Sequence, residues 1–356
     1  MTNVLTDFAG TDVHDAVQGR LDAFFSDRIS LATAYGDNYR LLWEAAREAS
    51  MGGKRFRPAL VVGVYRDLGG ADDDSALRIA TAFELLHTAF LLHDDVIDHD
   101  VVRRGVPNLV GSFAADATAR GASDVAARTW GEASAILAGD LLIQAAQGFI
   151  ARLGVADDIR GPLLDLFDRS VFVTAAGELS DVAFSARVLV PSLTDVMDMT
   201  EQKTASYSFE APLKAGALLA GADADTLGTL GEFGRLVGIA FQLRDDLLGV
   251  FGDADVTGKS VLNDLRNGKE TPLIAHARST AHWPGIEDAI GEPGLSDADV
   301  LTLRDALEEC GARAFVDALI TDHVTRAVDL IESSALPPTL TAHLRDVARH
   351  AVVRAA

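Results

Sequence analysis

Apolar residues recur every three and four positions along most of the chain, which is the spacing of one helix face. This pattern predicts helices over nine ranges: residues 13–29, 39–49, 76–97, 129–153, 162–182, 226–248, 297–309, 315–331 and 340–353. The alternation of apolar and polar residues that indicates β-strands joined by hairpin turns is absent. The sequence shows no fixed repeat, and no low-complexity linker divides it. We therefore predict one all-α domain over residues 1–356, with ten or more helices around a central cavity and residues 1–11 as a loose N-terminal segment.

Composition narrows the class of protein. The chain has 356 residues, 48% of them hydrophobic, and a formal net charge of −22. The apolar fraction argues against general disorder, and the acid excess argues against nucleic-acid binding. Cys310 is the single cysteine, so a disulfide framework is excluded and a reducing, cytoplasmic location is expected. We expect no membrane span and no secretory signal, because no apolar run reaches about 18 residues and no basic leader precedes one.

Lysine is rare, with five lysines against twenty-six arginines. Codon bias toward arginine accounts for the imbalance, so each remaining lysine is a candidate for a site that needs a compact ammonium group. The loop at 51–58, MGGKRFRP, places three cations before a helix expected to begin near Pro58, which predicts an anion site. The segment at 251–269 is rich in Gly and Asp and carries two lysines, so we expect it to form a lid.

One aspartate pair closes an apolar helix at His93-Asp94-Asp95-Val96-Ile97-Asp98. Asp94 and Asp98 are i and i+4, so they share a helix face with carboxylates about 6 Å apart. Like charges this close repel, and a divalent cation resolves the repulsion. Ligands that offer only oxygen suit Mg²⁺, which takes one or two carboxylates and completes its shell with water and phosphate.

A second pair, Asp245–Asp246, also ends an apolar helix, and Gly231, Gly234 and Gly238 on that helix permit close packing. Each pair could instead cap a helix end or be solvated. Both aspartate pairs, however, are followed by a loop that carries cations, and this combination favours a metal site over simple capping or solvation.

Histidine metal sites fit the sequence less well. His87, His93 and His99 are six residues apart, so they diverge around a helix. Glu84 and His87 form half of a di-iron ExxH motif, and the sequence has no second copy.

In combination these motifs resemble the polyprenyl synthetase family of trans-isoprenyl diphosphate synthases. The resemblance covers nearly the whole chain, and its matching segments are GGKRFRP at 52–58, LLHDDVID at 91–98, RRGVP at 103–107, GELSD at 177–181, KTASY at 203–207, FQLRDDLLGVFGD at 241–253 and GKSVLNDLRNGKET at 258–271. It implies an isoprenoid synthase type of all-α fold and a homodimer. It also implies head-to-tail condensation of isopentenyl diphosphate with dimethylallyl, geranyl or farnesyl diphosphate, using three Mg²⁺ ions, with Mn²⁺ as a substitute.

The resemblance assigns roles to individual residues. Those expected around the metal are Asp94, Asp95, Asp98, Asp245 and Asp246. Those expected at isopentenyl diphosphate are Gly53, Lys54, Arg57, His87 and Arg104. Those expected at the allylic diphosphate are Arg103, Lys203, Gln242, Lys259 and Lys269. The residues expected to be catalytic are Asp94, Asp95, Lys203, Thr204 and Gln242, of which Thr204 and Gln242 would lie beside the reacting carbons.

Three positions depart from the family pattern. Gly249 stands where many relatives carry a third aspartate, Glu178 where glutamine is common, and Asn108 where a small hydroxyl residue is common. None of the three removes an essential group. Pro212 should kink its helix and thereby turn Lys203 and Thr204 into the cavity.

Product length should depend on Ala89 and Phe90, which lie one turn before Asp94. One aromatic side chain blocks a channel less than two, so geranylgeranyl diphosphate is favoured over farnesyl diphosphate. A farnesyl diphosphate synthase, a terpene cyclase and a non-catalytic subunit of a prenyl synthase are the alternatives. A cyclase would not need GGKRFRP and would mix Asn, Ser or Thr with Glu in its second motif. A non-catalytic subunit would have lost aspartates.

Overall fold

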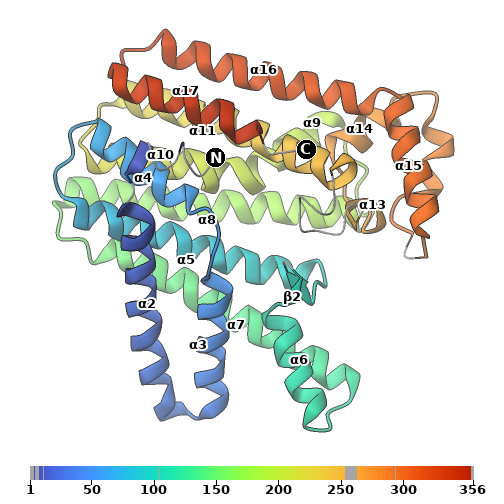
Figure 1. The fold of residues 1–356 in the computed structure, drawn as a ribbon, viewed down its shortest axis with the longest axis horizontal. Helices are drawn as coiled ribbons and strands as arrows, with labels where there is room; N and C mark the ends of the chain where they lie inside the picture. Colours follow the sequence, from blue (N-terminus) through green and yellow to red (C-terminus); the bar gives the residue numbers. More distant parts are fainter. Residues whose placement is uncertain are drawn as a thin grey trace. The chain divides into compact units, whose positions relative to one another are not determined.

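The computed structural model describes residues 4, 8–10, 12–103, 105–252, 263–292 and 294–353. Within this part of the chain the regular structure is helical apart from two short strands, which confirms the all-α prediction (Figure 1). The chain divides into two compact units. The N-terminal unit contains Thr2–Asp165 and Ala215–Ala222, and the C-terminal unit contains Leu166–Lys214 and Asp223–Ala356. The single domain and its central cavity stay predictions.

The N-terminal unit is built around a long central helix, α5. Its elements are α2 (Asp12–Ala32), η1 (Thr33–Tyr35), α3 (Asp37–Ser50), α4 (Phe56–Asp67), α5 (Asp73–Ile97), β1 (Val102–Arg103), β2 (Val106–Pro107), α6 (Leu109–Ala119) and α7 (Asp124–Ala151). Helix α5 packs against α4 and α7, and it runs beside α7 in Figure 1. Most of α5 is buried, as expected for a helix that is apolar around most of its circumference. The strands β1 and β2 form an antiparallel hairpin just beyond its end.

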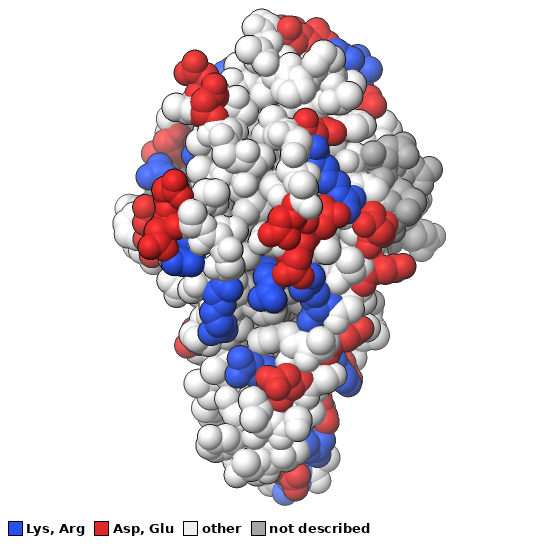
Figure 2. Space-filling view, turned by 90° about the vertical axis from the view of Figure 1, so that its left-hand side faces the viewer, with Lys and Arg blue, Asp and Glu red and all other residues white. Residues whose placement is uncertain are grey.

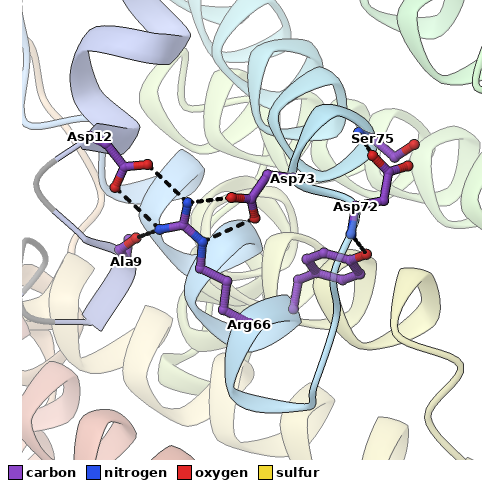
Figure 3. A network of polar contacts seen from close by, with 7 residues as sticks. Ala9, Asp12, Arg66, Asp72, Asp73 and Ser75 are labelled. Atoms are coloured by element: carbon purple, nitrogen blue, oxygen red, sulfur yellow. Dashed lines mark hydrogen bonds and ion pairs between the residues drawn. The ribbon is translucent and has the colours of Figure 1, made fainter.

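A polar network joins three helix ends of this unit (Figure 3). Arg66, near the end of α4, lies 2.9 Å from a carboxylate oxygen of Asp12 and 2.7 Å from one of Asp73, at the starts of α2 and α5. Arg66 also donates to the carbonyl of Ala9. Its hydrogen bond holds the pKa of Asp12 below the usual value. This hydrogen bond therefore stabilises the folded protein at neutral pH, and its contribution is lost as the pH falls through the lowered pKa of Asp12.

The C-terminal unit is built around α11. Its elements are the larger part of α8 (Asp157–Ser185), α9 (Leu193–Thr200), η2 (Glu201–Glu210), the start of α10 (Ala211–Leu219), α11 (Ala224–Phe251), α13 (Asn263–Arg266), α14 (Pro272–Arg278), η3 (Trp283–Gly285), η4 (Glu287–Ala289), α15 (Asp297–Glu309), α16 (Ala312–Glu332) and α17 (Pro338–Val352). Helix α11 packs against η2 and α16. A core that includes Leu243, Leu247 and Val316 joins α11 to the helices that follow it.

The segment η2 is a π-helix that lies directly between α9 and α10. Sequence patterning predicts a kink at Pro212, and the observed distortion lies just upstream, over Glu201–Glu210. The proline ring lacks an N–H and crowds the carbonyl of the preceding turn, so ordinary i to i−4 bonding cannot continue through it. Lys203 and Thr204 therefore lie in a widened helical turn, a form often found at functional sites.

Among the residues that the structure describes, two helices, α5 and α7, are long and apolar enough to cross a membrane by length and composition. The apolar window of α5 is 78% buried inside the protein, as in the core helix of a globular unit, whereas that of α7 is only 44% buried. In the space-filling view, acidic and basic side chains lie interspersed among uncharged ones (Figure 2).

Candidate active site

The end of α5 presents the first aspartate motif on a partly open helix face. His87, Phe90, Asp94 and Asp98 are each half-buried, at the spacing that the sequence predicts for one face. Ala89 is fully buried in the core of the unit, on another side of the helix from Asp94. Phe90 is thus the one of the two predicted chain-length residues that shares the face of the metal aspartates.

Asp95 lies between these carboxylates in sequence but is directed inward, and only 2% of it is exposed. Arg103 of β1 donates to Asp95 from Nη2 at 2.6 Å and from Nε at 3.0 Å, and it lies 3.4 Å from Asp94. Burial raises the pKa of Asp95, and the contacts from Arg103 offset this only in part. Burial alone would lower the pKa of Arg103, but its hydrogen bond to Asp95 and the nearby carboxylates raise it instead. The pair ties the β-hairpin to the end of α5.

Asn108 completes this loop. Its side-chain oxygen accepts from the N–H of Gly111 at 2.9 Å and so caps α6, while its amide nitrogen donates to the carbonyl of Asp100 at 2.8 Å. An N-cap side chain satisfies an N–H that has no partner within the helix. Although Asn108 replaces the small hydroxyl residue common in the family, it still caps the helix.

The loop before α4 has an unusual backbone. Gly52 and Gly53 have φ of 75° and 84°, and Arg55, at the N-cap of α4, has φ of 48°. Glycine adopts positive φ without strain, whereas arginine does not. A buried ion pair holds Arg55 in place, because its Nη1 lies 2.6 Å from Glu84 of α5. The carboxylate of Glu84 therefore has a structural role as the partner of Arg55, which agrees with the conclusion that Glu84 is not part of a di-iron motif.

The two predicted substrate cations in this loop differ in environment. Lys54 is exposed. Arg57 is only 5% exposed, and its guanidinium group lies 4.3 Å from the centre of the Phe56 ring. The helix begins at Phe56, two residues before the predicted Pro58.

In the C-terminal unit, Lys203 contacts two carboxylates of α8. Its Nζ lies 2.9 Å from Glu178 and 2.6 Å from Asp181. Gly177 makes this approach possible, because an added Cβ there would lie 2.4 Å from the backbone nitrogen of Lys203. The GELSD and KTASY segments thus form one local site, which sequence spacing alone does not reveal.

A hydrogen-bonded chain connects η2 to the second aspartate motif. Thr204 donates to Oε1 of Gln242 at 3.0 Å, and Nε2 of Gln242 donates to Asp246 at 2.8 Å. The two bonds hold the side-chain amide in one orientation. Asp245, Gln242 and Asp246 are all half-buried near the end of α11.

The glycine face of α11 permits this contact, as predicted. A Cβ at Gly234 would lie 2.7 Å from the backbone of Glu210, and one at Gly238 would lie 2.6 Å from Ala205. The two helical segments therefore pack at a separation that only glycine allows.

Two predicted site residues, Arg104 and Lys259, lie outside the described residues, as does most of the predicted lid. Lys269 is described and is half-buried. His93 contacts the carbonyl of Ile136 and Asp140, each at 3.3 Å, so it packs against α7.

The carboxylates fit a magnesium site of the kind that substrate phosphates complete. In the described ranges, no three His, Cys, Asp or Glu side chains of the protein converge closely enough to hold a metal by themselves. Mg²⁺ commonly binds through one or two carboxylates together with water and phosphate oxygens. The half-buried Asp94 and Asp98, and separately Asp245 and Asp246, offer such oxygen ligands.

Comparisons with known proteins agree with these motifs. Residues 40–303 match the family model described as polyprenyl synthetase. The (2E,6E)-farnesyl diphosphate synthase of Mycobacterium tuberculosis is 34% identical over 90% of this chain and 85% of its own length. The geranylfarnesyl diphosphate synthase of Aeropyrum pernix is 35% identical over 79% of this chain and 83% of its own.

Solved structures show the same relationship. A geranylgeranyl pyrophosphate synthase from Corynebacterium glutamicum, complexed with isoprenyl diphosphate and magnesium, superposes with a TM-score of 0.89 and 28% identity. The match covers 96% of this chain and 99% of that one. The chain therefore belongs to the polyprenyl synthetase family and is a trans-prenyltransferase, as its motifs predict.

Proposed function

We propose that this enzyme condenses isopentenyl diphosphate with an allylic diphosphate, head to tail, to give a short all-trans prenyl diphosphate, with geranylgeranyl diphosphate as the main product. The names of the relatives support this class of substrate, since they make farnesyl, geranylgeranyl and geranylfarnesyl diphosphates. Farnesyl diphosphate is the alternative product. The observation that carries the proposal is the half-buried pair Asp94 and Asp98 at the end of a buried helix.

The metal-binding role is assigned to Asp94 and Asp98 in one unit and to Asp245 and Asp246 in the other. Bound Mg²⁺ would neutralise the allylic diphosphate and stabilise it as a leaving group. Asp95 differs from Asp94 and Asp98 in its burial, because it is only 2% exposed and its carboxylate accepts from Arg103 at 2.6 Å. We assign Asp95 the role of holding Arg103 toward the allylic diphosphate.

The remaining side chains bind and orient the two substrates. Arg103, Lys203 and Lys269 contact the allylic diphosphate, which leaves with the electrons of the C–O bond. The hydroxyl of Thr204 and the amide oxygen of Gln242 place lone pairs beside the allylic cation, where positive charge develops. The 3.0 Å bond between them holds both oxygens in position before substrate binds.

Isopentenyl diphosphate is held by the loop before α4 and by His87 of α5. The exposed Lys54 contributes a mobile ammonium group, and the buried Arg57 a fixed guanidinium group. The double bond of isopentenyl diphosphate forms the new C–C bond, and the resulting cation loses a proton to an oxygen of the departed diphosphate. Water must be excluded because it would capture the cation.

We also propose a cytoplasmic homodimer. Its support is an apolar strip on α7 formed by Ile136 and Leu137, which are 44% and 57% exposed. Exposed apolar surface of this kind marks protein interfaces. On α8, Phe172 and Leu179 are 75% and 72% exposed and offer a second such strip. Cys310 has no disulfide partner, which fits a reducing compartment.

Replacing Asp94 by alanine tests the function. The rate with Mg²⁺, isopentenyl diphosphate and an allylic primer should fall by roughly a thousandfold, because an interaction worth several kcal/mol in the transition state is lost. Circular dichroism should show an unchanged helical fold. Asp116→Ala is the control, since Asp116 is a solvated carboxylate on α6 paired with Arg120. Normal turnover by the Asp94 variant would refute its metal role.

A further inference from the structure

A pocket of about 300 Å³ lies in the N-terminal unit, between α2, the start of α5 and the end of α7. Its lining carries two phenylalanines and four arginines: Phe24, Phe149, Arg20, Arg28, Arg78 and Arg152. Among the described residues that line it, none is acidic. A chain with a net charge of −22 therefore contains a pocket whose charge is strongly positive.

One carboxylate offsets part of this charge. Asp74 accepts from Arg78 at 2.8 Å and also from Arg20. These bonds, that from Arg78 first, hold the pKa of Asp74 below its usual value, so it is anionic at neutral pH. Four positive charges and one negative charge leave a balance of three positive charges at the pocket.

The other two arginines are held at the pocket by contacts that do not neutralise them. The guanidinium group of Arg28 lies 5.4 Å from the centre of the Phe24 ring. That of Arg152 lies over Gly148, where an added Cβ would come within 2.6 Å of Nη2. Over the described ranges, neither arginine has a carboxylate within 4.0 Å. The C-terminus of α7 favours a cation, which accounts for Arg152 but not for Arg28.

The rings of Phe24 and Phe149 lie edge to face, with centroids 5.7 Å apart. Both are half-buried, so each keeps part of its surface open to the pocket. An occupant would contact guanidinium groups and aromatic surface together. Arginine binds phosphate in a bidentate manner. Because the pocket has a balance of three positive charges, an occupant that neutralises them must carry more than one anionic oxygen.

From this we propose that the pocket is a second ligand site, which binds a phosphorylated molecule with at least two negative charges and a planar or apolar part. The site is separate from the catalytic one. Arg78 precedes Asp94 by sixteen residues on α5, which is about 24 Å along the helix axis. The proposal therefore does not depend on the roles given to the aspartate motifs.

Calorimetric titration of the full chain without added Mg²⁺ tests the proposal, with inorganic diphosphate and ADP as soluble probes. Arg28→Gln and Arg152→Gln should each weaken binding at the pocket roughly tenfold, since each removes a charged hydrogen-bonding group. Arg28→Lys should recover part of the affinity for inorganic diphosphate. Arg326→Gln, which changes an exposed arginine paired with Asp322 on α16, is the control and should bind as the unchanged protein does.

A second arm separates the two sources of a phosphate group. Vesicles with and without phosphatidic acid are sedimented with each variant. If only vesicle binding is lost in Arg28→Gln and Arg152→Gln, the ligand is a lipid headgroup and the proposal stands with that source. The condensation rate of both variants should stay within about twofold of the unchanged protein. If both variants bind diphosphate, ADP and vesicles as the unchanged protein does, the proposal is overturned.

Discussion

Lys203 has the clearest consequence at the scale of single residues, because its ammonium group already contacts two carboxylates. The distances are 2.9 Å to Glu178 and 2.6 Å to Asp181. A diphosphate that binds Lys203 must compete with both. In the proposed mechanism, Glu178 therefore lowers the affinity for the allylic substrate compared with the glutamine common at this position.

We predict that Glu178→Gln lowers the KM for the allylic diphosphate about three- to tenfold, because it removes one competing charge while keeping a hydrogen-bonding group. The KM for isopentenyl diphosphate should not change. Steady-state kinetics with each substrate varied in turn measure both values. Glu232→Gln is a matched control, since Glu232 pairs with Arg235 on the far part of α11. An unchanged allylic KM would remove Glu178 from the site.

Phe90 provides a test of product length. Because Phe90 shares the half-buried face of Asp94, Phe90→Ala should open space beside the growing chain and lengthen the product by at least one isoprene unit. Chromatography of dephosphorylated products measures chain length. The sequence predicts that Ala89→Phe shortens the product. Because Ala89 is fully buried, the new ring would also disturb the packing of the core. An unchanged product from Phe90→Ala would show that this side chain does not limit length.

Sequence spacing places Asp94 and Asp98 on one face because helical periodicity is a local property. The same spacing says nothing about Asp95, whose partner Arg103 reaches it through the register of a short hairpin. Lys203 and Glu178 are 25 positions apart, and only the packing of α8 on η2 brings them together. Contacts of this kind depend on tertiary structure, so patterning cannot supply them.

At the scale of elements, a buried ion pair fixes the loop that carries Lys54 and Arg57. Arg55 and Glu84 are 3% and 7% exposed at their side chains, and Arg55 also donates to Gln18 and to the carbonyl of Ser50. These contacts hold the arginine at its positive φ and set where α4 begins. We infer that this arginine shapes the substrate loop without contacting substrate.

Glu84→Leu should reduce the free energy of unfolding by about 3–5 kcal/mol, because it leaves the buried charge of Arg55 without its partner. Urea unfolding followed by circular dichroism measures this change. Glu44→Leu removes a partly exposed carboxylate that pairs with Arg40 within α3, and it should cost about 1 kcal/mol or less. Equal losses in the two variants would contradict a special role for the buried pair.

The helices themselves are well predicted where the apolar period is long. The expected range 39–49 lies within α3, and 340–353 overlaps α17 closely. The π-helix η2 is not predictable from that period, because it depends on how α9 and α10 are joined around Pro212. Helix α6 also lies outside the ranges that the apolar period predicts. Its eleven residues are rich in alanine, which gives little contrast between faces.

At the scale of the whole molecule, the residues with proposed roles at the substrates and metal are divided between the two units. The N-terminal unit carries Asp94, Asp98, Lys54 and Arg57, and the C-terminal unit carries Lys203, Thr204, Gln242 and Asp245. Each unit orders its own set through its own contacts.

The homodimer is predicted to depend on the apolar strip of α7. Joint replacement of Ile136 and Leu137 by aspartate should shift the mass seen by light scattering from that of a dimer to that of a monomer, because buried charge destabilises an apolar interface. Leu301→Asp is the control, since Leu301 is a comparably exposed leucine on α15. A dimer that persists in the double variant would place the interface elsewhere.

The most direct test incubates the purified protein with Mg²⁺, isopentenyl diphosphate and each allylic primer in turn, and identifies the products by chain length. We predict an all-trans prenyl diphosphate, mainly geranylgeranyl diphosphate, formed only with the metal present and with one diphosphate released for each unit added. Failure to extend any primer, or release of a cyclic hydrocarbon from the primer alone, would contradict the proposed condensation.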